Sequence, residues 1–329
     1  MTETVSTEVT TTDFTVGVPT YNGAERLPAL LRALRSQAQV ESLSWEVLIV
    51  DNNSTDNTAE VVAAWQAEWP DSSRLRYCLE PRQGAAYARQ RAISEATSPW
   101  IGLLDDDNIP APDWIAQAHR FAQVHPEAGA FGGQIHGEFE APPPPGFRRI
   151  QSFLAIRERG DTAHKYEPET LNLPPAAAVV VRRCAWQESV PETPILAGRV
   201  GSSMIGGEDF EVMLHMHHHG WEIWYTPDLH ANHKIPSWRL ERTYLQSLIR
   251  AASLCICPLR LINASPLRQP AIAAKIFLGA LRRAVLHWLK YRNTLKTDDV
   301  AACEMTFFMW TMLSPLYLVK KRFFYEANT

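Results

Sequence analysis

Residues 100–108 read Trp-Ile-Gly-Leu-Leu-Asp-Asp-Asp-Asn, an apolar run that stops at three consecutive aspartates. The apolar part is typical of a short strand buried on both faces of a sheet. In an open parallel sheet, ligands bind beyond the carboxyl ends of the strands. The stretch therefore predicts a buried strand that carries Asp105, Asp106 and Asp107 to the binding edge of a sheet.

Strand and helix patterns alternate on both sides of this stretch. Apolar runs at residues 14–18, 45–50 and 75–79 predict strands, and helical spacing predicts helices at 27–34, 56–69, 85–96 and 113–125. Such alternation favours an α/β fold, with helices on both faces of a mostly parallel sheet. Beyond Gly133 the pattern breaks, and prolines 142–145 mark a loop. A strand at 176–181, a helix at 208–219 and a short strand at 222–225 are expected to follow.

Two more polar clusters follow predicted strands. Pro19-Thr20-Tyr21-Asn22 comes after the first strand, and Asp51-Asn52-Asn53-Ser54-Thr55-Asp56 comes after the second. Each cluster alone would also suit a turn or a helix cap, which favour the same residue types. Three such clusters at one edge of one sheet favour a binding site.

The aspartate triplet favours a divalent cation. Adjacent carboxylates repel one another, and without a cation some of their pKa values would rise. Hard oxygen ligands suit Mg²⁺ or Mn²⁺, and such an ion keeps positions open for the oxygens of a diphosphate. The alternative is a solvated turn before Pro110.

Motifs of two other nucleotide-binding classes are missing from the sequence. No Gly-x-Gly-x-x-Gly follows the first strand, and no Gly-Lys-Ser/Thr loop occurs, which argues against dinucleotide oxidoreductases and P-loop enzymes. Phosphate must then meet the cation and basic side chains. Gly84 begins a tight turn at a helix start, where backbone N–H groups favour anions, and Arg89 lies one turn further on. The alternative for Arg89 is a surface ion pair.

Together, the strand followed by Pro-x-Tyr-Asn, the strand followed by Asp-x-x-Ser-x-Asp, Gly-x-Ala-x-Ala-Arg, and the strand followed by Asp-Asp-Asp resemble glycosyltransferase family 2 with its GT-A fold. The order and spacing match over residues 14–233. The chain as a whole is similar to bacterial and cyanobacterial exopolysaccharide glycosyltransferases of the hormogonium polysaccharide type. The resemblance implies a GT-A domain followed by a helical C-terminal appendage.

The resemblance also implies roles for single residues. Asp51 would accept a hydrogen bond from the nucleotide base, and Asp106 would shape its turn. The donor-binding set would be Pro19, Thr20, Tyr21, Asn22, Asp51, Asn53, Gly84, Arg89, Asp105 and Asp106, and the metal ligands would be Asp107, Asp105 and His233. Many members have Asp-Asp-Gly-Ser after the second strand where this chain has Asp51-Asn52-Asn53-Ser54, so the nucleotide is less securely implied. A UDP-sugar is expected first, with GDP- and dTDP-sugars open.

A second acidic motif supplies a candidate base. Inverting sugar transfer needs a carboxylate that takes the proton of the acceptor hydroxyl. Gly206-Gly207-Glu208-Asp209 opens a predicted helix and resembles the family's Glu-Asp motif, with Asp209 as the base and Glu208 orienting the acceptor. The alternative is a helix start that favours acids in its first turn. Trp238 and Arg239 are expected to line the acceptor or pyrophosphate side.

The C-terminal part of the chain is basic and apolar. Between Arg239 and Lys296 lie 11 Lys and Arg residues and one acid, in a chain whose formal net charge is −4. Helices are expected at residues 246–261 and 272–289. The apolar run at 305–319 is shorter than the roughly 20 residues needed to span a bilayer. An anionic membrane surface is the expected partner. Pairing with another subunit is the alternative, and nucleic acid is not expected.

These observations predict a flexible leader (residues 1–12), a catalytic domain (13–237, with a nucleotide-sugar half to 133 and an acceptor half from 134) and a membrane- or partner-associating region (238–329). They predict an inverting, metal-dependent glycosyltransferase at the cytoplasmic face of the cell membrane, acting on a glycan or lipid-linked glycan acceptor. One alternative is a nucleotidyltransferase that makes nucleotide-sugars, which would release pyrophosphate from sugar phosphate and NTP. Another is a catalytically inactive, nucleotide-binding scaffold of the same fold.

Overall fold

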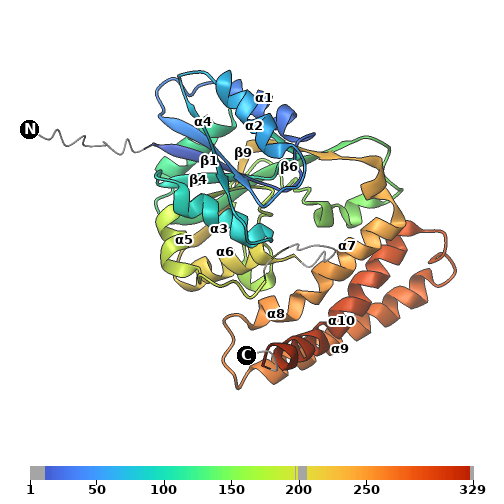
Figure 1. The fold of residues 1–329 in the computed structure, drawn as a ribbon. Coiled ribbons are helices and arrows are strands. Elements are labelled where there is room, and N and C mark those ends of the chain that lie inside the picture. Colours follow the sequence, from blue (N-terminus) through green and yellow to red (C-terminus); the bar gives the residue numbers. More distant parts are fainter. Residues whose placement is uncertain (1–11, 197, 199–205, 327–329) are drawn as a thin grey trace, which may run out of the picture.

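The structure is a computed structural model and describes residues 12–196, 198 and 206–326 (Figure 1). The predicted leader lies outside the described residues apart from Thr12. Four parallel strands form one side of a nine-stranded sheet in the order β3-β2-β1-β4. They are β1 (Phe14–Thr20), β2 (Trp45–Asp51), β3 (Arg74–Leu79) and β4 (Trp100–Leu104). These are the strands that the apolar runs predicted; β1, β2 and β4 are almost fully buried, whereas β3, at the edge of the sheet, is mostly half-buried.

The other side of the sheet is mixed. Beyond β4 the order is β8-β6-β9-β5, and β7 pairs with β9. The bounds are β5 (Asn108–Pro110), β6 (Ala128–Phe139), β7 (His164–Lys165), β8 (Ala178–Arg182) and β9 (Glu222–Ile235). β8 is antiparallel to both β4 and β6, whereas β6 and β9 are parallel. β6 runs through residue 133, where the sequence pattern had suggested a boundary between two halves.

The prediction of a short strand at 222–225 is wrong, because β9 continues through Pro227 to Ile235. The pairing of β6 with β9 shifts register between Gly132 and Gln134, which makes room for the proline. Gly133 allows this close approach, since a Cβ there would lie 1.9 Å from the Leu229 carbonyl oxygen. His233 therefore lies inside a strand, paired with Asn108 of β5.

Helices cover both faces of the sheet. On one face, α1 (Leu27–Arg35), α2 (Thr58–Ala67) and α4 (Trp114–Val124) share a core with β1 and β2. On the other face lie α3 (Ala85–Glu95), α5 (Arg183–Ser189) and α6 (Glu208–His218). The leucines at helical spacing in α1 are all buried. Short 3₁₀ turns occur at Phe147–Arg149, Gln151–Leu154, Pro168–Thr170 and Ser237–Leu240. The predicted α/β class is confirmed.

The C-terminal part forms a helical layer at the lower right of Figure 1, orange to red. It consists of α7 (Arg242–Leu254), α8 (Ile256–Leu261), α9 (Gln269–Tyr291) and α10 (Asp299–Glu326). α10 packs on α7, α8 and α9 and contains the apolar run predicted at 305–319. A third core joins this layer to the sheet, with Leu154 and Ile235 meeting Leu245 and Val300. None of the described helices is long and apolar enough to cross a bilayer.

Candidate active site

The loops that follow β1 and β2 bind each other. The two strands are parallel and end in register, Thr20 opposite Asp51. The Asn22 side chain accepts a hydrogen bond from the Thr55 amide (2.8 Å), and the Asn22 amide donates to Ser54 Oγ (2.9 Å). Asn22 has a positive φ of 49°, which asparagine tolerates better than most residues. The polar side chains of these two motifs thus shape the loops, and Asn22 is not among the described residues that line the cleft.

Asp51 is buried and turned away from the cleft. Its Oδ2 accepts the Tyr77 hydroxyl (2.8 Å) and its Oδ1 accepts the Ser54 amide (2.8 Å). Burial and the Asp51 charge raise the pKa of Tyr77 to about 12, so the phenol remains a donor. Each carboxylate oxygen of Asp51 thus accepts one hydrogen bond from the protein and keeps a second lone pair, so its predicted contact with a nucleotide base stays a prediction. Asn53 is exposed at a positive φ and, like Asp51, is absent from the described cleft lining.

Asn52 is the residue of the second motif that faces the cleft. Its Oδ1 accepts the Gly84 amide (2.8 Å), and its Nδ2 donates to the carbonyls of Glu80 (3.1 Å) and Arg82 (2.6 Å). One buried amide therefore holds the turn that starts α3. The Gly84 amide, which was predicted to donate to an anion, already donates to this side chain. The backbone φ of 138° at Gly84 favours glycine. The Asn52 role was missed because its partners lie about 30 residues away.

Asp106 is a structural member of the acidic triplet. It is buried and accepts hydrogen bonds from Thr20 Oγ1 (2.6 Å) and from Arg26 through Nε (2.8 Å) and Nη2 (2.9 Å). Burial raises its pKa, although Arg26 acts in the opposite direction. Gly23 is required beside it, since a Cβ there would lie 1.9 Å from Thr20 Oγ1. The sequence carried no signal for Arg26, because the pair is 80 residues apart.

Asp107 faces a histidine and an arginine. Its Oδ2 lies 3.4 Å from His233 Nε2 and accepts a hydrogen bond from Arg239 Nη1 (2.8 Å). Burial alone would raise the pKa of Asp107, but His233, when its ring is protonated on both nitrogens, and Arg239 hold it well below its usual range. The His233 Nδ1 is 2.7 Å from the Leu154 carbonyl, which can only accept. Nδ1 therefore carries the proton, and the Nε2 lone pair faces Arg239 Nη1 (3.1 Å) and Asp107.

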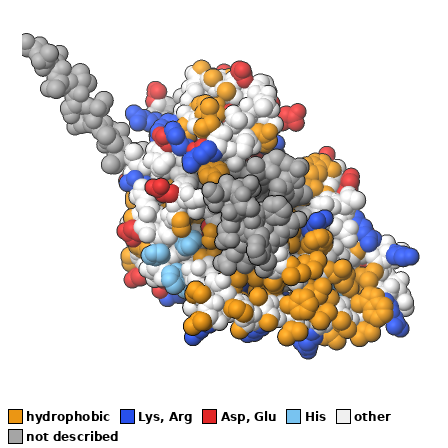
Figure 2. Space-filling view, turned by 60° about the horizontal axis from the view of Figure 1, so that its bottom comes forward, with side chains coloured by type: hydrophobic (Ala, Val, Ile, Leu, Met, Phe, Trp, Pro, Cys, Tyr) orange, Lys and Arg blue, Asp and Glu red, His pale blue; other side chains and the backbone are white. Residues whose placement is uncertain are grey.

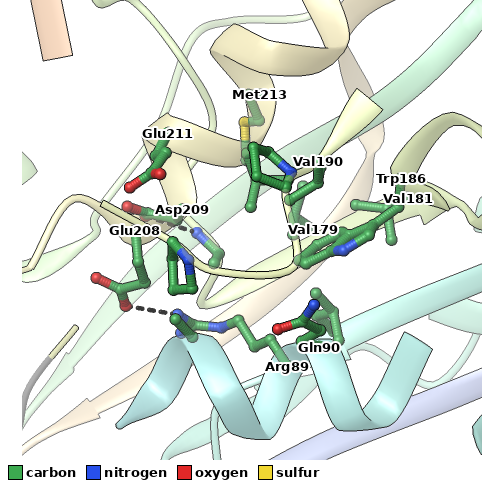
Figure 3. A pocket seen from close by; sticks show the side chains of 16 residues that line it. Arg89, Gln90, Val179, Val181, Trp186, Val190, Glu208, Asp209, Glu211 and Met213 are labelled. Carbon is green, nitrogen blue, oxygen red and sulfur yellow. Dashed lines mark hydrogen bonds and ion pairs between the residues drawn. The ribbon is translucent and has the colours of Figure 1, made fainter. Parts of the chain in front are cut away.

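Arg89 connects the acidic triplet to the second acidic motif. Its Nη2 donates to Asp105 Oδ1 (2.9 Å) and its Nη1 donates to Glu208 Oε1 (2.6 Å). The arginine is buried, and these two acids raise its pKa despite the opposing effect of burial. The surface ion pair that the sequence allowed is thus a buried bridge between α3, β4 and α6. Figure 3 shows the guanidinium rising from α3 towards Glu208.

Asp209 lies beside this bridge at the start of α6. Its Oδ2 accepts the Ala176 amide (3.2 Å), and it borders a small, largely apolar cavity of about 30 Å³ that Val179, Trp186 and Met213 also line (Figure 3). The surrounding protein raises the pKa of Asp209 to about 6, and the Glu208 charge adds to this while Arg89 opposes it. A carboxylate with such a pKa can accept a proton near neutral pH.

These groups meet in one open cleft of about 780 Å³, the size of a site for a small organic ligand. The predicted residues among those that line it are Pro19, Thr20, Tyr21, Arg89, Asp105, Asp106, Asp107, Glu208, Asp209 and His233. Trp238 and Arg239 line it too, as expected. Arg26, Gln83 and Arg157, and an apolar wall from the C-terminal helices, also line the cleft and were not predicted as site residues.

A partly parallel α/β sheet that brings an aspartate triplet and a Glu-Asp pair to one cleft has the GT-A fold. The chain belongs to glycosyl transferase family 2, whose model matches residues 15–186, more than half of the sequence. The resemblance seen in the sequence motifs is thereby confirmed, and the chain is an enzyme of the glycosyltransferase class.

Individual relatives are distant. The succinoglycan biosynthesis protein ExoM of Rhizobium meliloti is 24% identical over 233 residues, 70% of this chain and 69% of ExoM. The glycosyltransferase AglE of Haloferax volcanii is 28% identical over 160 residues, so the match spans half of AglE. Among solved structures, the mannosyltransferase PcManGT of Pyrobaculum calidifontis, in complex with GDP-Man and Mn²⁺, matches with a TM-score of 0.57. The match covers 94% of this chain and 88% of PcManGT at 21% identity, which establishes a common fold.

Proposed function

We propose that this enzyme transfers a sugar, with inversion, from a nucleotide-diphosphate donor to a hydroxyl of a glycan or lipid-linked glycan. The observation that carries the proposal is the single cleft in which Asp105 and Asp107 face the same space as Asp209. Arg89 links the two acidic groups directly, so the donor and acceptor ends of the cleft have a fixed relation.

The donor end lies at the carboxyl edge of β1 and β4. Tyr21 is exposed at the cleft and offers a flat ring to a nucleotide base, while Pro19 and Thr20 line the wall beside it. PcManGT holds GDP-Man with Mn²⁺, which supports a nucleotide-sugar and a divalent cation as a class. We expect a UDP-sugar first, with GDP- and dTDP-sugars as the other options. Because Asp51 is not among the described residues that line the cleft, we assign base contacts to the cleft-facing residues of these loops.

We propose Asp107 and His233 as ligands of a divalent cation; in the described part of the chain no three His, Cys, Asp or Glu side chains are yet gathered closely enough to hold one, and Arg239 lies between this pair. The proton of His233 is fixed on Nδ1 by the Leu154 carbonyl, which leaves Nε2 as a ligand facing the Asp107 carboxylate. Asp105, whose side chain is partly exposed at the cleft, would complete the protein ligands to Mg²⁺ or Mn²⁺. When bound, the cation would neutralise charge that develops on the departing diphosphate. Arg239, which now donates to Asp107, would be free to meet a phosphate oxygen.

Asp209 is the proposed base. It takes the proton of the acceptor hydroxyl as that oxygen bonds to the anomeric carbon of the sugar, and the bond from this carbon to the diphosphate oxygen breaks. The nucleoside diphosphate leaves with the bonding electron pair. Glu208, held by Arg89 at 2.6 Å, would orient the acceptor beside Asp209. The shielded position of Asp209 favours a carboxylate basic enough for this step.

The acceptor and the location of the enzyme are proposed from the relatives and from the C-terminal sequence. ExoM is named for succinoglycan biosynthesis, which supports a cell-surface polysaccharide intermediate as the acceptor. We propose that residues 13–237 carry catalysis and that residues 238–329 hold the enzyme at the cytoplasmic face of the membrane.

The decisive test is donor binding and turnover with purified protein. We expect a UDP-sugar, a GDP-sugar or a dTDP-sugar to raise the thermal midpoint in the presence of Mn²⁺, since ligands that bind only the folded state stabilise it. Donor hydrolysis should require the cation and fall sharply in Asp107→Ala, whereas Asp71→Asn, an exposed acid outside the cleft, should behave as wild type. Unchanged turnover and metal dependence in Asp107→Ala would contradict the proposal. Pyrophosphate release from a sugar phosphate and NTP would indicate a nucleotidyltransferase instead.

A further inference from the structure

The outer face of α9 exposes large apolar side chains, with Lys275 and Arg282 interleaved among them at helical spacing. Within this 23-residue helix, Ala280 and His287 are buried against the rest of the helical layer, and His287 contacts the Ala301 carbonyl of α10 at 2.9 Å. The opposite side exposes large apolar side chains. They are Leu278 (62%), Val285 (48%), Leu286 (51%), Trp288 (49%) and Leu289 (54%). Figure 2 shows such a hydrophobic surface over the C-terminal helices, edged by Lys and Arg. Contiguous apolar surface of this kind indicates an interaction site.

The same helix carries only positive charge. Lys275, Arg282, Arg283 and Lys290 are all exposed, and so is Arg292, which directly follows the helix. The sequence has no acid between residues 242 and 297, so no carboxylate of this segment offsets them. Arg292 lies 5.9 Å from the ring of Trp288, which places a cation beside the aromatic surface. Apolar and aromatic side chains flanked by Lys and Arg are typical of helices that lie in a membrane interface.

We propose that α9 docks this protein onto an anionic lipid bilayer, with its apolar face in the headgroup region and its basic residues against lipid phosphates. Charge decides between this partner and a second copy of the chain. A symmetric pairing through α9 would set five exposed cations of one copy against the same five of the other. An anionic surface instead attracts all of them.

The docking helix belongs to the layer that also walls the cleft. α10 packs on α9 and contributes Phe307 to the cleft, and α7 and α8 contribute Leu248, Ala252 and Leu259. Docking through α9 would therefore hold an apolar wall of the cleft close to the lipid. If the proposed function holds, this position suits an acceptor whose lipid part remains in the membrane. The docking itself rests on the α9 surface alone.

Vesicle flotation tests the docking independently of catalysis. The full chain should float with phosphatidylglycerol-containing vesicles, remain unbound with phosphatidylcholine alone, and dissociate as salt rises. Arg282→Gln with Lys290→Gln should weaken partitioning roughly fivefold for each charge removed. Leu278→Gln with Leu289→Gln should abolish binding. Val124→Gln removes an apolar side chain that is also exposed (67%) but lies on α4, and it should float as wild type.

Each variant is compared with wild type by thermal unfolding, because all of these positions are exposed and the fold should be retained. Failure to float, or equal binding to neutral vesicles, would overturn the docking proposal. If the wild type forms a concentration-dependent dimer and the double variant Leu278→Gln, Leu289→Gln is monomeric, this face binds a second copy of the chain instead. Donor turnover in detergent-free buffer should be unchanged in these variants, so loss of flotation and loss of sugar transfer can be told apart.

Discussion

Opposing influences set the proton affinity of Asp209. The surrounding protein and the Glu208 charge raise its pKa to about 6, whereas Arg89 lowers it. Each influence comes from a different part of the chain, since Arg89 belongs to α3 and Ala176 precedes β8. The base strength of Asp209 is thus a property of how these segments pack around the start of α6.

The pH dependence of turnover follows from this pKa. A general base must be ionised, so kcat/KM should fall about tenfold per pH unit below about pH 6 and level off above it. Asp209→Asn should reduce transfer roughly 10²–10⁴-fold while the donor still binds. Calorimetry of donor binding alongside initial rates separates the two effects. If kcat/KM of the wild type does not fall below about pH 6, or if Asp209→Asn keeps full activity, Asp209 is not the base.

Arg89 should affect both stability and pH dependence. Arg89→Met leaves the buried Glu208 without its 2.6 Å partner, and breaking a buried ion pair costs about 3–5 kcal/mol. Because Arg89 lowers the pKa of Asp209, its removal should move the acid limb of kcat/KM to higher pH. Chemical denaturation and a pH–rate profile check the two effects. Arg120→Met, on the exposed surface of α4, serves as the control. A variant that loses stability but keeps its acid limb would show a purely structural role.

At the scale of elements, loops after separate strands depend on one another. The Asn52 amide at the end of β2 satisfies the Gly84 amide and the carbonyls of Glu80 and Arg82. Asn52→Ala leaves these groups unpaired, at about 1–3 kcal/mol for each one that remains buried. We expect lower stability and weaker donor binding, measured by urea unfolding and calorimetry. Asn263→Ala, which removes an amide at the far helical layer, should leave donor binding intact.

The elements nearest the donor site were the most predictable. β1, β2 and β4 are continuous apolar runs that end at polar residues, so local sequence determines them. β9 was predicted too short because a proline such as Pro227 normally ends a strand. Here the register shift opposite Gly133 allows β9 to continue past it. The pairing of Arg26 with Asp106 spans 80 residues, so no local pattern could indicate it. Likewise, the motif identified Asp51 but could not show that Tyr77 would bind it.

At the scale of the molecule, the acidic triplet is stabilised from three directions. Asp105 pairs with Arg89 of α3, Asp106 with Arg26 before α1, and Asp107 with Arg239, which adjoins α7. From the sequence, only a cation was expected to relieve the repulsion among these carboxylates. Among the described residues, arginines already provide much of that relief. Arg239 connects this arrangement to the C-terminal helical layer.

The same helical layer packs against Leu154, whose backbone carbonyl accepts a hydrogen bond from His233. Leu154, whose carbonyl fixes the His233 proton, packs in the core shared with Leu245 of α7. Leu245→Ala should destabilise the fold by about 2–5 kcal/mol because it opens a cavity in that core. We also expect weaker Mn²⁺ binding, since a shifted Leu154 carbonyl no longer holds Nε2 of His233 towards Asp107.

Leu30→Ala separates this coupling from simple loss of stability. Leu30 is equally buried but belongs to α1, in a core that contains neither Leu154 nor Leu245. Its truncation should cost a similar free energy of unfolding while Mn²⁺ affinity stays at the wild-type value. Calorimetric titration with Mn²⁺, at a temperature where both variants are fully folded, makes the comparison. Equal losses of affinity in the two variants would mean that the metal site responds to global stability. A loss confined to Leu245→Ala would mean that the helical layer forms part of the catalytic structure, because it positions a ligand that it does not itself contain.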